Sequence, residues 1–211
     1  MNTLSICVVK DCERKIHAKG ICFKHYLQLR RSGSIAVRTR YDKNRIDTKG
    51  NSSFISLYDN RESEVATAVI DTEDIAKVKN LKWRFIKSKG YAISGRGKAA
   101  VLMHRFIIDA PKGLLIDHVN FNKLDNRKIN LRVCSSFQNM QHRKLTKRNV
   151  TGIKGIYWHK QTQKWAVEIR KDNKKYWLGL YDSKECAARV YDKAAKKLHG
   201  KFAHTNDKED R

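Results

Sequence analysis

The stretch GLLIDHVNFNKLDNRKINLRVCSSFQNMQHR, residues 113–143, contains three segments whose local structure follows from residue type. The apolar residues 113–118 predict a short strand, the polar residues 120–128 predict a loop, and residues 129–134 predict a returning strand. Ser135 and Gln138 have the S-x-x-Q spacing of a capping box, so we expect a helix to begin there. The stretch therefore predicts a β-hairpin followed by a helix.

Several polar side chains are expected to meet on this hairpin and helix. Asp117 and His118 are consecutive in a strand, so they point to opposite faces and can serve different partners. Asn139 lies one turn into the helix, and His142 and Arg143 share its face, from which they could contact phosphates. Hydrolysis of a phosphodiester needs a base that activates water and a cation that neutralises charge. An imidazole beside carboxylate and amide oxygens supplies the residue types for both.

A longer segment, LMHRFIIDAPKGLLIDHVNFNKLDNRKINLRVCSSFQNMQHR at residues 102–143, resembles the HNH endonucleases of phages and mobile introns. The resemblance implies a ββα-metal (His-Me) core in which His118 is the general base, Asn130 braces the hairpin and Asn139 occupies the third motif position. With Asn in place of the third His, the chain is similar to Mg²⁺-dependent homing endonucleases, in which Asp117 and Asn139 would bind one cation. An all-oxygen pair suits Mg²⁺ or Mn²⁺ better than Zn²⁺.

Further DNA contacts are expected around this core. His104 and Arg105, expected in an apolar strand before the hairpin, match a His-Arg pair common in the same family and are assigned to phosphate contact. Arg127 and Arg132 on the hairpin are assigned to DNA as well. An isolated Asp-His dipeptide is usually a surface accident, but the agreement of hairpin, loop, capped helix and late Asn favours a site.

The charge of the chain points to a polyanionic partner. The chain has 46 Lys and Arg against 21 Asp and Glu, and its net charge of +25 on 211 residues exceeds what solubility requires. Basic residues recur along the whole chain, which favours an extended DNA duplex over a membrane patch. No apolar run approaches membrane-spanning length, and the start lacks a secretory signal. We expect a soluble cytoplasmic protein that binds double-stranded DNA, with no membrane or small-molecule partner; a monomer is expected, and a dimer stays open.

Three of the five cysteines gather near the N-terminus in a pattern typical of a zinc site. Cys7, Cys12, Cys22 and His25 have the spacing C-x4-C-x9-C-x2-H, in a segment too short to bury a core of its own. Bound Zn²⁺ would supply the missing stability, although buried free thiols are the simpler alternative. His17 could replace His25, but the Cys22-to-His25 spacing is tighter. The segment is similar to zinc knuckles that precede phage HNH domains; Cys134 and Cys186 are interpreted as core residues.

The region between knuckle and hairpin divides into a linker and a small sheet. Residues 32–53 are rich in Gly, Ser, Asn and basic residues and are interpreted as a linker. Strand-like runs follow at residues 54–58, 64–71, 82–87, 90–94 and 101–108, with a short helix expected at 72–79. Large aromatic and aliphatic side chains in these runs are expected in the core: Trp83, Phe85, Tyr91 and Ile93.

The C-terminal part changes character after a second basic linker at residues 146–152. Three alternating strands at residues 155–159, 164–171 and 174–181, the last two joined at Asp172-Asn173, precede a helix at 183–199. The helix carries an apolar stripe of Ala187, Val190, Tyr191, Ala194 and Leu198 and ends at Gly200. A three-stranded sheet packed on one helix is therefore expected.

Alternation along the strands assigns their side chains to two faces. The face toward the helix is expected to hold Ile156, Trp158, Trp165, Val167, Ile169, Tyr176, Leu178 and Leu180. The opposite face is expected to hold Tyr157, His159, Glu168, Arg170, Lys175 and Trp177. Such a face can enter a major groove, where Arg170 would read guanine and Trp177 would pack on sugars or bases, with Lys154 as a further contact. A merely solvated charged face is the alternative.

The block with GIYW, WAVEIR, YWLGLY and CAARVYDKAAKKLHG in order resembles the plant ethylene-response-factor (Apetala-type) DNA-binding domain. The resemblance implies that Glu168, Arg170 and Trp177 occupy groove-contacting positions. Tyr157 and His159 stand where the plant domains carry arginines, and the turn before Trp165 is one residue longer, so the plant recognition sequence is not expected to carry over.

The sequence thus predicts an α+β chain with a zinc knuckle at 1–31, a basic linker at 32–53, a nuclease domain with an accessory sheet at 54–145, its ββα-metal core at about 102–145, a linker at 146–152 and an Apetala-type domain at 153–206. The predicted function is a sequence-directed DNA endonuclease of the homing type that uses one Mg²⁺ or Mn²⁺ and nicks one strand per site. The alternative is a DNA-binding transcriptional regulator with a degenerate nuclease core.

Overall fold

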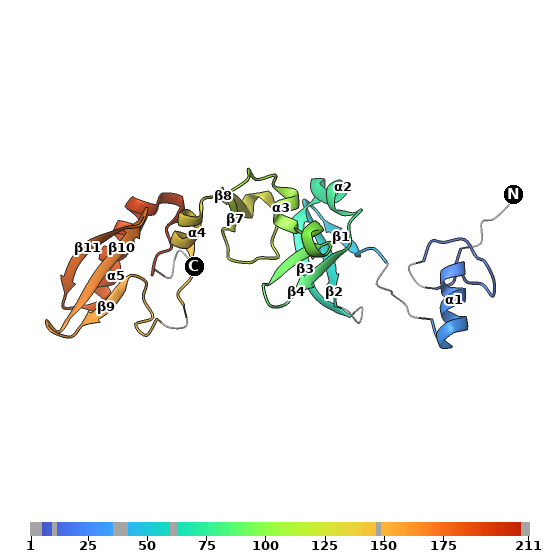
Figure 1. The fold of residues 1–211 in the computed structure, drawn as a ribbon, viewed down its shortest axis with the longest axis horizontal. Helices are drawn as coiled ribbons and strands as arrows, with labels where there is room; N and C mark the ends of the chain where they lie inside the picture. Colours follow the sequence, from blue (N-terminus) through green and yellow to red (C-terminus); the bar gives the residue numbers. More distant parts are fainter. Residues whose placement is uncertain (1–5, 10–11, 36–41, 60–62, 147–148, 208–211) are drawn as a thin grey trace.

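The computed structural model describes residues 6–9, 12–35, 42–59, 63–146 and 149–207. These residues form three bodies that follow one another along the longest axis of the molecule, from a helix at the N-terminal end to a three-stranded sheet at the C-terminal end (Figure 1). Within the described ranges, none of the helices has both the length and the apolar character needed to cross a membrane. The mixed α+β composition expected from the sequence is confirmed.

The N-terminal body is one helix, α1 (Phe23–Ser32), preceded by a loop that isolated bridges hold together. Lys19 and Gly20 have positive φ angles of 52° and 74° and make the turn that brings Cys22 to the start of α1. The buried apolar residues of this body are Cys7, Ile21 and Cys22. Such a core is too small to stabilise a fold by apolar burial alone.

The second body begins with a six-stranded sheet of described strands: β1 (Ile46–Lys49), β2 (Ser52–Tyr58), β3 (Glu64–Asp71), β4 (Trp83–Ile86), β5 (Tyr91–Ser94) and β6 (Val101–Leu102). The strand order is β1-β2-β4-β5-β6, with β3 paired to β2. Strand β1 and the start of β2 lie within residues 32–53, so the second half of the segment interpreted as a linker belongs to the sheet. In β2 the alternate residues Ile55 and Leu57 are completely buried. Their burial holds β2 in the sheet together with its polar first residues.

The core of this sheet lies around Trp83, whose side chain is 1% exposed and whose Nε1 donates to the Val78 carbonyl at 3.0 Å. The expected short helix is present as η1 (Thr72–Asp74) and α2 (Ile75–Val78). The core position of Trp83 is confirmed, and Phe85 packs at its edge. Tyr91 is only half-buried and lines a pocket instead of the core.

The apolar run at residues 101–108, expected as a strand, is mostly a helix. Of this run, only Val101 and Leu102 pair with β5, and they follow the short turn η2 (Gly97–Ala99). Helix α3 (Met103–Ile107) comes next. Met103 and Ile107 are four residues apart and are both buried, so a helical turn puts both side chains onto the sheet. A short apolar run does not distinguish a strand from a buried helix by its pattern, and here the helix is found.

The hairpin and its helix have the form expected from the sequence. Strands β7 (Leu115–His118) and β8 (Leu131–Cys134) pair antiparallel with Asp117 opposite Arg132, and η3 (Lys128–Asn130) closes the loop. Helix α4 (Ser136–His142) begins with both hydrogen bonds of a capping box between Ser135 and Gln138.

The C-terminal body has strands β9 (Ile156–His159), β10 (Lys164–Lys171) and β11 (Lys174–Tyr181) in the order β11-β10-β9, covered by α5 (Lys184–His199) and followed by η4 (Gly200–Phe202). Asp172 and Asn173 have φ angles of 49° and 62°, the conformation of a tight hairpin turn. The sheet and helix expected from the sequence are therefore confirmed.

The core between this sheet and α5 differs in detail from the expected apolar face. Its buried members are Ile156, Val167, Ile169, Ala187, Tyr191 and Ala195. Trp158 and Tyr176, expected in this core, are 44% and 40% exposed. A β-bulge between Val167 and Glu168 shifts the register, so simple alternation fails there. Cys134 is buried as expected, but Cys186 is exposed on α5, and its assignment to the core was wrong.

Candidate active site and nucleic-acid interface

A pocket of about 820 Å³ lies between the hairpin, α4, α3 and β5. It brings together the following residues singled out in the sequence: His104, Arg105, Asp117, His118, Asn139, His142 and Arg143. Tyr91, Phe121 and Lys123 also line it and were not expected there. Sequence spacing could not place Tyr91 in this pocket because β5 is distant from the hairpin along the chain.

The Asp117 carboxylate lies at the centre of a set of short contacts. Nε of Arg132 donates to Oδ2 at 2.8 Å, and Nδ1 of His142 lies 2.9 Å from Oδ2 and 3.1 Å from Oδ1. Burial by itself would raise the pKa of Asp117, but the hydrogen bonds from His142 and Arg132 outweigh it and hold the pKa below its ordinary value. The carboxylate is therefore ionised at neutral pH.

Arg132 and His142, both assigned to DNA contact from the sequence, lie inside the protein on Asp117. The His142 ring is 6% exposed and stacks on Phe121 with centroids 4.1 Å apart and planes 7° apart. The side chain of Arg132 is 15% exposed and extends to the C-terminal body. No sequence pattern indicates these contacts, because Asp117 and His142 are brought together only when α4 folds back on the hairpin.

His118 faces two other rings. Its imidazole lies 5.0 Å from that of His104 and 5.9 Å from the Tyr91 ring, centroid to centroid. Burial lowers the pKa of His118. Burial, together with the repulsion that protonated His104 would feel from a protonated His118, lowers the pKa of His104 to about 3. Both rings are therefore neutral at pH 7. Among the described residues, Nε2 of His118 and Nδ1 of His104 are buried without a hydrogen-bond partner.

Asn130 holds the loop of the hairpin. Its Oδ1 accepts from the Asn120 backbone N–H at 2.9 Å, and its Nδ2 donates to the Asp125 carbonyl at 2.7 Å. The Asp125 carboxylate in turn accepts from Arg127 at 2.8 and 2.7 Å, and this contact lowers the pKa of Asp125. Arg127, assigned to DNA from the sequence, is thus paired inside the loop. Asp125 was not among the site residues predicted from the sequence, although it lies in the predicted loop, two residues before Arg127.

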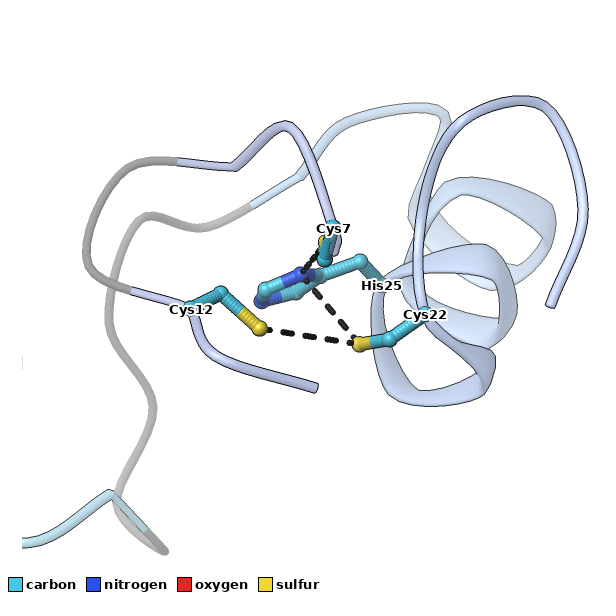
Figure 2. Close-up of side chains that lie close together, drawn as sticks. All are labelled: Cys7, Cys12, Cys22 and His25. Atoms are coloured by element: carbon cyan, nitrogen blue, oxygen red, sulfur yellow. Dashed lines mark hydrogen bonds between the residues drawn. The ribbon is translucent and has the colours of Figure 1, made fainter. Parts of the chain in front are cut away.

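The four predicted ligands of the N-terminal body lie together (Figure 2). Nδ1 of His25 is 3.2 Å from Sγ of Cys7 and 3.5 Å from Sγ of Cys22, and the Cys12 and Cys22 sulfurs are 3.8 Å apart. Tetrahedral ligands at the usual zinc–sulfur distance are about 3.8 Å apart, so the donor set and its spacing fit Zn²⁺. Desolvation raises the pKa of Cys7, but hydrogen bonds, chiefly with His25, lower it to about 6, which favours a thiolate ligand.

His17, the alternative fourth ligand, lies elsewhere. Its ring packs edge-on against Phe23 and Tyr26, with centroids 4.8 and 5.4 Å away. It therefore supports α1 by packing, and His25 completes the cluster.

The predicted DNA face of the C-terminal sheet is largely exposed. Glu168 pairs with Trp177 across the strands and Arg170 with Lys175, so these four side chains share one face. The Glu168 carboxylate accepts from Tyr157 Oη at 2.9 Å and lies 2.6 Å from Lys175 Nζ. Burial would raise the pKa of Glu168, but these two contacts lower it. Trp177 is 53% exposed, which leaves its indole available to a partner.

Two further residues assigned to DNA have partners within the chain. Nζ of Lys154 donates to the carbonyls of Gln141 and Arg143 at the end of α4, and burial lowers its pKa to about 8. His159 Nδ1 is 2.8 Å from Thr162 Oγ1.

This chain is similar to one protein family over its C-terminal part and to several known proteins. Residues 151–201 match the AP2 domain family. Protein 3.8 of Escherichia phage T7 is 33% identical over 93 residues, covering 44% of this chain and 76% of the phage protein. An uncharacterized HNH endonuclease of Acanthamoeba polyphaga mimivirus is 31% identical over 136 residues, covering 61% of this chain and 68% of the viral protein.

Because this chain is 31% identical to the mimivirus HNH endonuclease and covers 68% of it, the chain belongs to the HNH endonuclease family. Its C-terminal body is an AP2 domain. Dehydration-responsive element-binding protein 2D of Arabidopsis thaliana is 49% identical over 45 residues, 20% of this chain and 22% of the plant protein. No solved structure matches the chain.

Proposed function

We propose that this protein is a DNA endonuclease that hydrolyses a phosphodiester of duplex DNA in the pocket beside the β7–β8 hairpin. The observation that carries this proposal is the convergence of Asp117, His118 and Asn139 on one pocket. The HNH endonuclease name of the mimivirus relative and the AP2 domain support it. We assign the hairpin and α4 to a ββα-metal core at about residues 102–145, within a nuclease domain at 54–145.

Asp117 and Asn139 are the residues that would hold one divalent cation, Mg²⁺ or Mn²⁺. Asp117 is ionised, and among the described residues its Oδ1 has His142 as its one neighbour within hydrogen-bond distance, whereas three nitrogen atoms of Arg132 and His142 lie within 2.9 Å of Oδ2. Carboxylate and amide oxygens are ligands of hard cations. When bound, the cation would neutralise the charge that develops on the phosphate and on the departing 3′ oxygen.

His118 is the proposed general base. Its neutral ring has a nitrogen lone pair that can accept a proton from water, and the resulting hydroxide oxygen bonds to phosphorus as the bond to the 3′ oxygen breaks. The 3′ oxygen then takes up a proton and leaves as a hydroxyl. Asn130 keeps the loop that follows His118 in place through Asn120 and Asp125.

The two terminal bodies supply DNA binding in this proposal. The exposed face with Arg170 and Trp177 would enter a groove and select sequence, and the basic residues of the N-terminal body would contact phosphates. We assign the knuckle to residues 1–31 and the AP2-type body to 153–206, with Zn²⁺ in the cluster of Figure 2. A monomer then nicks one strand with its single active site.

Plasmid nicking by the full chain tests the proposal. We expect nicking with Mg²⁺ or Mn²⁺, none with chelator, and loss of nicking in Asp117→Asn, His118→Ala and Asn139→Ala with duplex binding retained. Asp109→Ala, which removes an exposed carboxylate outside the pocket, is the matched control and should cleave normally. A wild-type chain that binds duplex in every condition and cleaves in none would instead be a DNA-binding regulator with a degenerate nuclease core.

A further inference from the structure

The guanidinium of Arg132 joins the nuclease hairpin to the AP2-type body. On one side Nε donates to Asp117 Oδ2 at 2.8 Å, and Nη2 lies 2.7 Å from the same oxygen. On the other side Nη1 donates to the backbone carbonyl of Lys201, and the guanidinium carbon lies 4.2 Å from the centre of the Phe202 ring. Lys201 and Phe202 belong to η4, which follows the long helix of the AP2-type body.

Other contacts bring the same two bodies together around this point. Lys154, at the start of the C-terminal body, donates to the Arg143 carbonyl at 2.9 Å, where α4 ends. The His204 ring lies 5.1 Å from Phe121 and 6.2 Å from His142, centroid to centroid. Phe202 is 2% exposed, so the surface under Arg132 is closed to solvent. The AP2-type body therefore packs directly beside the Asp117 carboxylate.

The geometry on Asp117 gives Arg132 a specific effect. Arg132 contacts Oδ2 and not Oδ1, so it fixes the rotation of a carboxylate that lines the pocket, whereas His142 lies within 3.1 Å of both oxygens. A guanidinium is planar and rigid, so its orientation on the carboxylate is set by whatever holds its other edge and its face. Here the other edge rests on Lys201 and the face on Phe202.

We infer that Arg132 is a positioning residue through which the docked AP2-type body fixes the metal-binding carboxylate of the nuclease site. The inference rests on the proposed function in that Asp117 is taken as a ligand of the cation. Partners that orient a metal ligand typically change metal affinity by 10- to 100-fold when they are lost. Docking of the AP2-type body on the hairpin is therefore linked to the affinity of the nuclease site for its cation, although none of the described residues that line the pocket belongs to that body.

Manganese binding and cleavage by four variants of the full chain test this coupling. Arg132→Lys keeps the positive charge but replaces the planar guanidinium with an ammonium group. Phe202→Leu keeps an apolar side chain but removes the ring that supports the guanidinium. Lys201→Ala is the control, because Arg132 donates to the backbone carbonyl of Lys201, and in the described part of the chain the Lys201 side chain approaches only the Phe202 ring, with Nζ 5.6 Å from its centre. The fourth variant combines Arg132→Lys with Phe202→Leu. Electron paramagnetic resonance measures Mn²⁺ affinity with a duplex of non-cleavable backbone present, and nicking of an ordinary plasmid gives the Mn²⁺ dependence and the maximal rate.

We expect Arg132→Lys and Phe202→Leu each to weaken Mn²⁺ affinity about tenfold, with duplex affinity close to that of Lys201→Ala. Because Phe202 is buried, Phe202→Leu should also unfold at a lower temperature than Lys201→Ala. The double variant should be no weaker than Arg132→Lys, because Phe202 acts through Arg132. Unchanged or tighter Mn²⁺ binding in either single variant, or additive losses in the double variant, would overturn the inference. Weakened Mn²⁺ binding in a chain that never nicks DNA would leave the coupling intact and refute the proposed nuclease function alone.

Discussion

Gly155 is the position where one added methyl group should most severely disturb the AP2-type body. It has a φ angle of +73°, and an ideal Cβ built there would lie 2.1 and 2.2 Å from Cε2 and Cδ2 of Tyr191 and 2.7 Å from the Glu168 carbonyl oxygen. Tyr191 is 2% exposed in the centre of the core and has no space to withdraw into. The Gly155 carbonyl also accepts the Glu168 N–H at 2.9 Å, beside the bulge that shapes the DNA-binding face.

The size of the effect follows from two terms. A left-handed conformation costs a residue with a Cβ roughly 1–2 kcal/mol, and overpacking a filled core costs typically about 1–3 kcal/mol. Gly155→Ala should therefore destabilise this body by about 2–5 kcal/mol. Native domains are stable by only about 5–15 kcal/mol, so this loss is a large fraction of the total. At about 4–8 °C per kcal/mol for a small domain, the variant should melt roughly 8–40 °C lower.

Gly152→Ala is the matched control for this prediction. Gly152 has a φ angle of +70° and open space around its Cβ position, so its substitution carries the backbone cost without the clash. Thermal unfolding followed by tryptophan fluorescence should show a loss of about 1–2 kcal/mol for Gly152→Ala and a clearly larger loss for Gly155→Ala. Equal losses in the two variants would refute the close packing of Gly155 on Tyr191.

Three further predictions concern the sites. Because burial lowers the pKa of His118 and the neutral ring is the base, nicking in Mn²⁺ should rise with pH and reach half its maximum below pH 6.5, the ordinary value for His; a rate that still climbs through pH 7.5 would contradict this. Removal of zinc by a chelator should increase hydrogen exchange in α1 while the β7–β8 hairpin stays protected, and uniform protection would speak against a structural metal. Arg170→Ala should relax base preference by roughly 1–3 kcal/mol at one base pair, measured by selection from random duplexes, whereas equal weakening on all sequences would indicate a phosphate contact.

The sequence predicted those features that depend on local spacing. The capping box at Ser135 and Gln138, the hairpin before it and the strand–turn–strand at Asp172-Asn173 are determined by residues close together in the chain. The Cys and His cluster was predictable for the same reason, since four soft ligands within twenty residues have few other uses.

What the sequence did not predict depends on contacts between distant segments. The apolar residues of α3 were expected as a strand because their pattern fits either element, and only the shape of the sheet core decides between them. Arg132 was expected on DNA as a basic residue of the hairpin, and His142 because it shares the helix face of Asn139. Their position on Asp117 depends on how α4 and the hairpin pack, and spacing along the chain does not encode that distance.

The exposed Cys186 thiol on α5 makes this chain suitable for site-selective dye labelling. Cys134 is buried, and burial raises its pKa, so that thiol reacts slowly with maleimides. The three N-terminal thiols would be shielded once they bind zinc. A fluorophore on Cys186 would lie on the helix behind the sheet, away from the face with Arg170 and Trp177. It would report how single molecules slide and reside on stretched DNA without obstructing DNA binding by that face.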